Sequence, residues 1–281
     1  MHLLQLFLLF IVPVDTDIER LHFVDNGKTI QTIEREQMSL DDIFIDEKKL
    51  IGIIQKLNEL MYTPPQHATI NDEDQIIKEK PGRQLNVLKT KQLLHQFFYE
   101  GNITHSSIPT EQVFPRVDSE LLSQINARKL GVYTTDFTES NKERAHNIRL
   151  SADAINNHVV FPGEKFSFNE VVGERTKARG YKRAPVIVKG ELTEDVGGGI
   201  CQVSSTLFNA VHLKGIQIVE RYKHSRSVPY VPPGKDAAVS WWGPDFVFKN
   251  KYNQPILIRT RTDQGKITIT IYSAEDATPS K

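Results

Sequence analysis

The single cysteine of this 281-residue chain, Cys201, lies directly behind the stretch Gly197-Gly198-Gly199-Ile200. The residues that follow, from Val203 to Val211, are apolar at i, i+4, i+7 and i+8, the spacing of a buried helical stripe. We therefore expect a helix with Cys201 at or next to its N-terminus, where unpaired N–H groups and the helix dipole favour a thiolate or hold an anion. The glycines would let a substrate or an oxyanion come close. Cys201 is thus a candidate nucleophile; in the alternative interpretation it is a small buried packing residue, a common role of a free cysteine.

His224 is the candidate general base for this cysteine. One helix running out from Cys201 and one strand at residues 216–221 coming back would return the chain to the Cys201 end, where His224 follows the strand. His212 is excluded as the partner, because it lies further along the same helix, about 16 Å away at 1.5 Å per residue. In the alternative interpretation, His224 is a polar residue that caps the strand end beside Ser225.

Acyl transfer would also need an oxyanion site and a group that orients the imidazole. The backbone N–H groups of Cys201 and Gln202, or the side-chain amide of Gln202, are the candidate oxyanion donors. Glu220 and Asn169 are the candidates to orient the imidazole of His224.

Composition narrows the function classes. Lys+Arg and Asp+Glu are equal at 35 each, and a net charge of zero gives no support to nucleic-acid binding or to electrostatic attachment to a membrane. One cysteine excludes an intramolecular disulfide and a structural zinc site, and the histidines lack metal-ligand spacing. The glycine triplet lacks the Lys-Ser/Thr of an NTP-binding loop, and the sequence has no serine-centred nucleophile elbow. We therefore expect neither a metal nor a cofactor.

The chain begins with an apolar segment, residues 1–14, whose run at 3–12 has the length of a signal-peptide core. This run is too short to span a bilayer comfortably. It lacks a basic region before it and a clean small-x-small cleavage site after it, and a buried strand or an anchor would have the same pattern. We expect an exported, extracytoplasmic protein, which this segment could attach to a membrane.

The remaining pattern predicts an α+β fold in two domains, each with mixed helices and antiparallel or mixed β-sheet. Residues 15–117 form the first domain, and a connecting helix at 118–129 follows it. The first domain is expected to contain a hairpin at 21–24 and 29–33 around Asn26-Gly27, a helix from Asp46 to Pro64-Pro65, a hairpin at 67–78 and a helix at 90–99.

Residues 130–275 form the expected second domain, and 276–281 a tail. Apolar residues at 3-4-3-4 spacing from Ala145 to Val159 predict a helix that opens at Asn141. The Cys201 helix is the second. The expected strands are 130–137, 166–168, 181–189, 216–221, 238–242, 246–248, 256–260 and 266–272.

Five motifs follow one another in this second domain. They are Arg144 with Asn147-Ile148, residues 161–169 (FPGEKFSFN), 199–207 (GICQVSSTL), Glu220-Arg221 with His224-Ser225, and 231–237 (VPPGKDA). In these motifs the chain resembles the VanW family, and residues 43–117 resemble the peptidoglycan-binding module that precedes catalytic domains in some cell-wall proteins. The resemblance implies a bacterial cell-envelope protein, associated with the wall or membrane, whose partner is peptidoglycan or its precursors. Members of the family occur in glycopeptide-resistance clusters and widely outside them.

Two functions agree with this resemblance. In the first, Cys201 and His224 carry out cysteine-dependent acyl transfer or amide hydrolysis on peptidoglycan stem peptides. In the second, the protein is a non-catalytic wall-binding accessory protein, in which the glycine turn holds a carboxylate or phosphate and Cys201 is a packing residue. Trp241, Trp242 and Tyr230 would then stack on sugar rings.

Because neighbouring residues of a strand alternate faces, we expect at most one of Trp241 and Trp242 to be exposed to a ligand and the other to lie in the core. Arg221 would bind a carboxylate of the stem peptide or be solvated. The candidate substrate- and oxyanion-binding residues are Gly198, Gly199, Gln202, Ser204, Ser205, Arg221, Trp241 and Asn169.

Overall fold

The computed structural model describes residues 19–25, 27–188 and 191–280; the apolar segment 1–14 and Asn26 of the first expected turn lie outside them. The chain divides into two compact units, one formed by residues up to 66 with 80–116 and one formed by 67–79 with 117–281. Both combine helices with small sheets, so the predicted α+β class is confirmed. Within the described ranges, no helix has the length and apolar character needed to cross a membrane.

The described residues of the first unit form two small sheets and two α-helices. β1 (Arg20–Asp25) pairs antiparallel with β2 (Lys28–Glu34) and parallel with β6 (His105–Ser107), and β5 (Gly82–Leu85) pairs antiparallel with β7 (Thr110–Val113). The helices are the 3-10 helix η2 (Arg35–Met38), α1 (Glu47–Met61) and α2 (Val87–Glu100).

Capping residues set the ends of both α-helices of this unit. The side chain of Asp46 accepts hydrogen bonds from the first-turn N–H groups of α1, as the sequence predicts. Gly101 ends α2 in the left-handed conformation, at φ 62°. The apolar faces of the two helices bury Leu50 and Phe97 against Phe23 of β1.

The second unit carries the Cys201 helix. A four-stranded antiparallel sheet has the order β8 (Arg128–Asp136), β16 (Lys266–Ser273), β15 (Ile256–Asp263) and β9 (His158–Val160), and a three-stranded antiparallel sheet has the order β10 (Lys165–Ser167), β14 (Val247–Asn250) and β13 (Ile216–Glu220). Two hairpins are β3 (Thr69–Ile70) with β4 (Ile76–Ile77) and β11 (Arg183–Val188) with β12 (Glu191–Val196). The helices are α3 (Ser119–Ile125), α4 (Lys142–Ile155), α5 (Phe168–Val172), the 3-10 helix η3 (Lys177–Arg179) and α6 (Ile200–Ala210).

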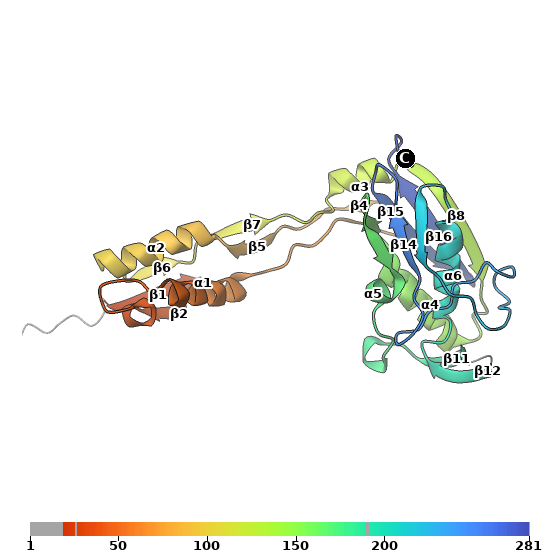
Figure 1. Ribbon diagram of the computed structural model, residues 1–281, viewed down its shortest axis with the longest axis horizontal. Coiled ribbons are helices and arrows are strands. Elements are labelled where there is room, and N and C mark those ends of the chain that lie inside the picture. Colours follow the sequence, from red (N-terminus) through yellow and green to blue (C-terminus); the bar gives the residue numbers. More distant parts are fainter. Residues whose placement is uncertain (1–18, 26, 189–190, 281) are drawn as a thin grey trace, which may run out of the picture. The chain divides into compact units, whose positions relative to one another are not determined.

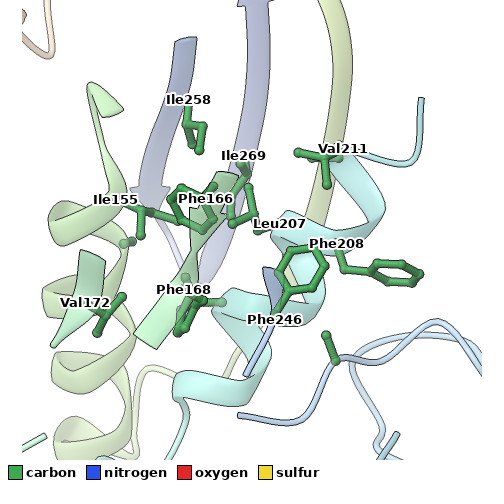
Figure 2. Packing of buried hydrophobic residues seen from close by; sticks show 14 of the residues in the cluster. Ile155, Phe166, Phe168, Val172, Leu207, Phe208, Val211, Phe246, Ile258 and Ile269 are labelled. Carbon is green, nitrogen blue, oxygen red and sulfur yellow. The ribbon is translucent and has the colours of Figure 1, made fainter. Parts of the chain in front are cut away.

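The core of this unit fixes the helix that carries Cys201. α4 and α6 both pack against the four-stranded sheet and against each other (Figure 1). Figure 2 shows the aromatic ring of Phe166 close to Ile155 of α4 and Leu207 of α6, and all three side chains are almost fully buried. Each such side chain contributes roughly 1.5–3 kcal/mol by leaving water. The position of α6 is therefore set by its buried apolar stripe.

The structure corrects two expected elements of the second unit and adds a partner to a third. The helix expected to reach Val159 ends at Ile155, because Asn157 adopts a left-handed φ of 62° and Val159 continues in β9. Residues 238–242 do not form a strand, because the N–H of Ser240 donates to the carbonyl of Pro244 and closes a turn at 2.8 Å. The strand expected at 181–189 is present as β11, and it pairs with β12, a strand that the sequence analysis did not predict.

The hairpin β3–β4, which the sequence analysis placed in residues 15–117, packs within the second unit. The backbone N–H of Ala68 donates to Val117 at 3.0 Å, and the side chain of Asn157 hydrogen-bonds both backbone groups of Ile70. Buried apolar side chains of the hairpin, α3 and Leu257 of β15 form one cluster. The hairpin is thus held by the sheet of the second unit.

Candidate functional site

The turn before Cys201 is shaped so that two arginine side chains lie on it. Helix α6 begins directly after Gly199, which is left-handed at φ 107° and has no side-chain cap. A Cβ at Gly199 would lie 2.9 Å from Cγ of Arg144, and a Cβ at Gly197, where φ is 92°, would lie 3.1 Å from Cβ of Arg175. Glycine accommodates both the backbone conformation and the close contact. The turn therefore brings Arg144 and Arg175 to the end of the helix that carries Cys201.

Gly198 has a different neighbourhood. A Cβ at this position would lie 2.4 Å from the carbonyl oxygen of Ala184. The carbonyl of Gly198 accepts a hydrogen bond at 3.0 Å from the buried amide of Asn147, which also donates to Lys182 at 2.9 Å. Gly198 thus holds the turn against α4 and β11, whereas Gly199 lines the neighbouring pocket.

His224 lies between Cys201 and Asp236. Nδ1 of His224 is 2.7 Å from Oδ2 of Asp236, and the backbone N–H of His224 donates to the same oxygen at 2.6 Å. The side chains of His224 and Asp236 are 7% and 9% exposed. Burial by itself would lower the pKa of His224, but the hydrogen bonds and charges of Cys201 and Asp236 outweigh it and raise the pKa above 6.5. The thiol of Cys201 donates a hydrogen bond to the carbonyl of Val239 at 3.4 Å. A cysteine, a histidine and a carboxylate that holds the histidine are the groups that a thiol nucleophile requires.

The carboxylate that orients the imidazole is a residue to which the sequence analysis gave no role. Glu220 and Asn169 were the expected candidates, but Glu220 accepts a hydrogen bond from a backbone N–H at 3.2 Å and Asn169 is occupied elsewhere. Burial by itself would raise the pKa of Asp236. The hydrogen bonds from His224 outweigh this effect and hold the pKa of the carboxyl below 3.8, its ordinary value. Asp236 is the only acidic residue in 225–240, a signal that the sequence did contain.

Asn169 supports the site from behind. Its Nδ2 donates to the carbonyls of Ser240 at 3.0 Å and Pro244 at 3.2 Å, and its Oδ1 accepts from Nη2 of Arg175 at 2.6 Å. The side chain is almost fully buried. Asn169 therefore fixes Arg175 and the turn between Ser240 and Pro244. Its side-chain amide makes all of these hydrogen bonds to other residues of the protein.

Arg221 faces the segment that carries Asp236. Its Nε donates to the carbonyl of Asp236 and its Nη2 to that of Gly234, both at 2.7 Å. Its guanidinium lies 4.5 Å from the ring centroid of Phe208 and 3.6 Å from a carboxylate oxygen of Asp236. We therefore assign Arg221 to positioning Asp236 rather than to the substrate-binding role expected from the sequence.

Ser204 and Ser205 tie α6 to the residue after Asp236. The hydroxyl of Ser204 donates to the carbonyl of Ala237 at 2.6 Å, and the hydroxyl of Ser205 accepts from the N–H of Ala237 at 2.9 Å. Both serines are fully buried. These hydrogen bonds explain why two serines follow shortly after Cys201. They fix the backbone next to Asp236 against the helix that carries Cys201.

Of the expected oxyanion donors, Gln202 is already engaged. Its Nε2 donates to the hydroxyl of Thr135 at 2.9 Å and to the carbonyl of Asp136 at 2.8 Å, its Oε1 accepts from Arg144 at 2.7 Å, and its backbone N–H donates to Gly199 at 3.0 Å. Among the residues that the structure describes, none accepts a hydrogen bond from the backbone N–H of Cys201. That N–H is the expected donor that the geometry leaves for an oxyanion.

A pocket of about 950 Å³ opens beside Cys201 and His224. Trp241 and Trp242 both line it, their ring centroids 6.2 Å apart, and they are 38% and 88% exposed. The expectation that one of them lies in the core is therefore wrong, because the two residues lie in a turn and not in a strand. Tyr230 also lines the pocket, and burial together with the charge of Cys201 raises the pKa of its hydroxyl. The volume is that of a typical small-ligand site.

The described residues include no group of three or more histidine, cysteine or acidic side chains that could hold a metal ion.

Comparison with known proteins shows which sequences this chain is similar to. A family model described as "VanW like protein" matches residues 143–272, which contain Cys201, His224 and Asp236. The chain is 50% identical over 260 residues to the uncharacterized protein YoaR of Bacillus subtilis strain 168, covering 92% of this chain and 86% of that protein. It is 34% identical over 83 residues to the vancomycin B-type resistance protein VanW of Enterococcus faecalis V583, covering 30% of each chain. No solved structure matches the chain.

Proposed function

This chain belongs to the VanW-like protein family, and we propose that it is a cell-envelope enzyme in which Cys201 carries out acyl transfer or amide hydrolysis on peptidoglycan stem peptides. The observation that carries the proposal is that Cys201 and His224 line one pocket, while the carboxylate of Asp236 holds the imidazole of His224 at 2.7 Å. A thiol beside a buried imidazole, itself held by a carboxylate, is the arrangement that makes a cysteine nucleophilic.

The proposed reaction begins when His224 takes the proton of the Cys201 thiol. The thiolate attacks the amide carbonyl of the substrate, and the N–H of Cys201 donates to the oxygen on which negative charge develops. The tetrahedral adduct collapses, the C–N bond breaks, and the imidazolium returns its proton to the leaving amine. Water or an acceptor amine then attacks the thioester, gives a proton to His224, and releases Cys201. Proton transfer of this kind contributes roughly 10²–10⁴-fold to a rate.

Asp236 supports this cycle by stabilising the imidazolium that forms twice in it. The raised pKa of His224 is in the direction that an ion pair of thiolate and imidazolium requires. Arg221 and the two buried serines fix the backbone around Asp236, so the imidazole stays on the Cys201 side of the pocket.

Two observations support the proposed location in the cell envelope: the family and the N-terminal sequence. One relative is named a vancomycin B-type resistance protein, and the apolar run at residues 3–12 has the length of an export signal. We assign the first unit to peptidoglycan binding within the same proposal. Fractionation of cells that carry the tagged full-length chain tests this location: recovery in the cytoplasmic fraction contradicts it.

The experiment that tests the chemistry is a search for the acyl-enzyme. The folded chain is incubated with purified muropeptides, and the Cys201-containing peptide is weighed by mass spectrometry after an acid quench. We expect an added acyl mass on Cys201 that is absent in Cys201→Ala and strongly reduced in His224→Ala. His212→Ala, which changes an exposed histidine just beyond the C-terminal end of the same helix, is the matched control and should behave as wild type.

A second candidate function is favoured by the exposure of Trp241 and Trp242 at the pocket. Two accessible indole rings suit stacking on sugar rings, and a non-catalytic wall-binding protein would need no reactive thiol. A Cys201 thiol that stays unlabelled until the protein unfolds, combined with unchanged binding of muropeptides by Cys201→Ala, would make this second function the better one.

A further inference from the structure

Two guanidinium groups share the pocket with Cys201 and have no acidic partner. Nη2 of Arg144 donates to the neutral Oε1 of Gln202 at 2.7 Å. Arg175 donates to Oδ1 of Asn169 at 2.6 Å and to a backbone carbonyl at 3.2 Å. Over residues 19–25, 27–188 and 191–280, no carboxylate forms an ion pair with either guanidinium.

Burial disfavours the charged form of both arginines. It lowers the pKa of each guanidinium, because water solvates the positive charge less well inside the protein. The negative charge of a Cys201 thiolate acts on both in the opposite direction, so both cations lie within electrostatic reach of the nucleophile. Glu174 and Asp195 line the same pocket without pairing with them.

The glycine turn is the second, independent observation. Gly197 and Gly199 leave room for the aliphatic stems of Arg175 and Arg144, one on each glycine, directly before the helix that starts at the nucleophile. The backbone is therefore shaped around two cations that form no ion pair within the described residues, although the charge of Asp245 also acts on Arg175.

We propose that Arg144 and Arg175 bind a free carboxylate of the substrate, on a residue adjoining the carbonyl that Cys201 attacks. This inference rests on the proposed function and adds a substrate class to it: acyl donors with a carboxylate next to the scissile amide. Arginine suits the role because its planar fork donates two parallel hydrogen bonds to a carboxylate. The carboxylate belongs either to the leaving amino acid or to the side chain of the acyl residue.

The first test compares alkylation of Cys201 by iodoacetate and by iodoacetamide in the folded full chain. In both reactions the C–S bond forms, the C–I bond breaks and iodide leaves, so the ratio of rates cancels the thiolate fraction and reports the charge of the reagent. Relative to the urea-unfolded chain, wild type should favour iodoacetate. Arg144→Gln and Arg175→Gln should each reduce the ratio roughly tenfold, the effect of losing a charged hydrogen bond.

Arg149→Gln is the matched control, because Arg149 lies on the same helix as Arg144 and pairs with Glu139. An iodoacetate preference that is absent in wild type, or unchanged in both pocket variants, overturns the inference. The iodoacetamide rate shows that each variant keeps its folded site. A thiol that resists both reagents overturns the inference together with the proposed function.

The second test uses three synthetic peptide donors, with a carboxylate on the leaving residue, on the acyl side chain, or on neither. We expect one of the two charged donors to acylate Cys201 at least about tenfold faster than the neutral donor, and that advantage to be lost in Arg144→Gln. The preferred charged donor identifies the source of the carboxylate. Equal acylation by all three would leave the proposed function standing and overturn the carboxylate subsite.

Discussion

Replacement of Asp236 by Asn removes the charge opposite His224 and keeps the shape of the side chain. Oδ2 of Asp236 lies 2.7 Å from Nδ1 of His224 and accepts a hydrogen bond from the backbone N–H of His224 at 2.6 Å. Both side chains are more than nine-tenths buried. A hydrogen bond to a charged group is worth about 1.5–3 kcal/mol. Loss of this amount from the imidazolium corresponds to roughly a 10- to 100-fold slower reaction of Cys201 near neutral pH.

The assay is the rate of alkylation by iodoacetamide against pH, with the titration of His224 followed by NMR. The pKa of His224 should fall in Asp236→Asn, because burial lowers it and the stabilising carboxylate is gone. Asp153→Asn, which changes an exposed carboxylate of α4, is the control and should leave both measurements unchanged. An alkylation profile that is identical in Asp236→Asn and wild type would refute the assignment of Asp236 as the orienting group.

The same variant has a predicted pH dependence of stability. The pKa of His224 is raised on folding, so its contribution to stability is fully present below 6.5 and is lost as the pH rises through the folded value. The pKa of Asp236 is lowered on folding, so its contribution is present above 3.8 and is lost as the pH falls through its folded value. The stability deficit of Asp236→Asn should therefore be largest between pH 3.8 and 6.5 in urea denaturation.

Three further substitutions test the architecture around the site, and Gly52→Ala in the first unit is the control for the first of them. Gly198→Ala places a methyl group 2.4 Å from a backbone carbonyl and should lower the free energy of unfolding by about 1–3 kcal/mol in urea denaturation, whereas Gly52→Ala, in open space on α1, should raise it by roughly 0.5–1 kcal/mol. Gln202→Ala removes three side-chain hydrogen bonds and should cost about 1–3 kcal/mol, with a smaller loss counting against its bridging role. Trp242→Ala should change stability by less than about 0.5 kcal/mol, because the side chain is 88% exposed, and should weaken muropeptide binding in calorimetry; unchanged binding would remove Trp242 from the ligand site.

Local signals in the sequence predicted most of the elements. Asp46 caps α1 as its side-chain oxygen requires, and alternating apolar residues at 266–272 predicted β16. The helical spacing of apolar residues gave the wrong end for α4. Val159 continues that spacing but lies in β9, because Asn157 adopts a left-handed φ and turns the chain. The strand predicted at Trp241-Trp242 was wrong for a related reason. β-propensity alone does not reveal the turn that the hydrogen bond from Ser240 to the carbonyl of Pro244 closes.

What the sequence determined by itself about the site is the chemistry that is available and where it lies along the chain. A lone cysteine behind three glycines fixes a thiol at a helix N-terminus, and the return of one strand brings His224 to the same end, because helix rise and strand direction are local properties of the backbone. The tertiary structure decided which partners these residues have. Asp236 rather than Glu220 meets the imidazole, although Glu220 is nearer to His224 in sequence, and Arg221 holds Asp236. The packing of α6 against Ala237, which sequence distance does not reveal, decides this choice.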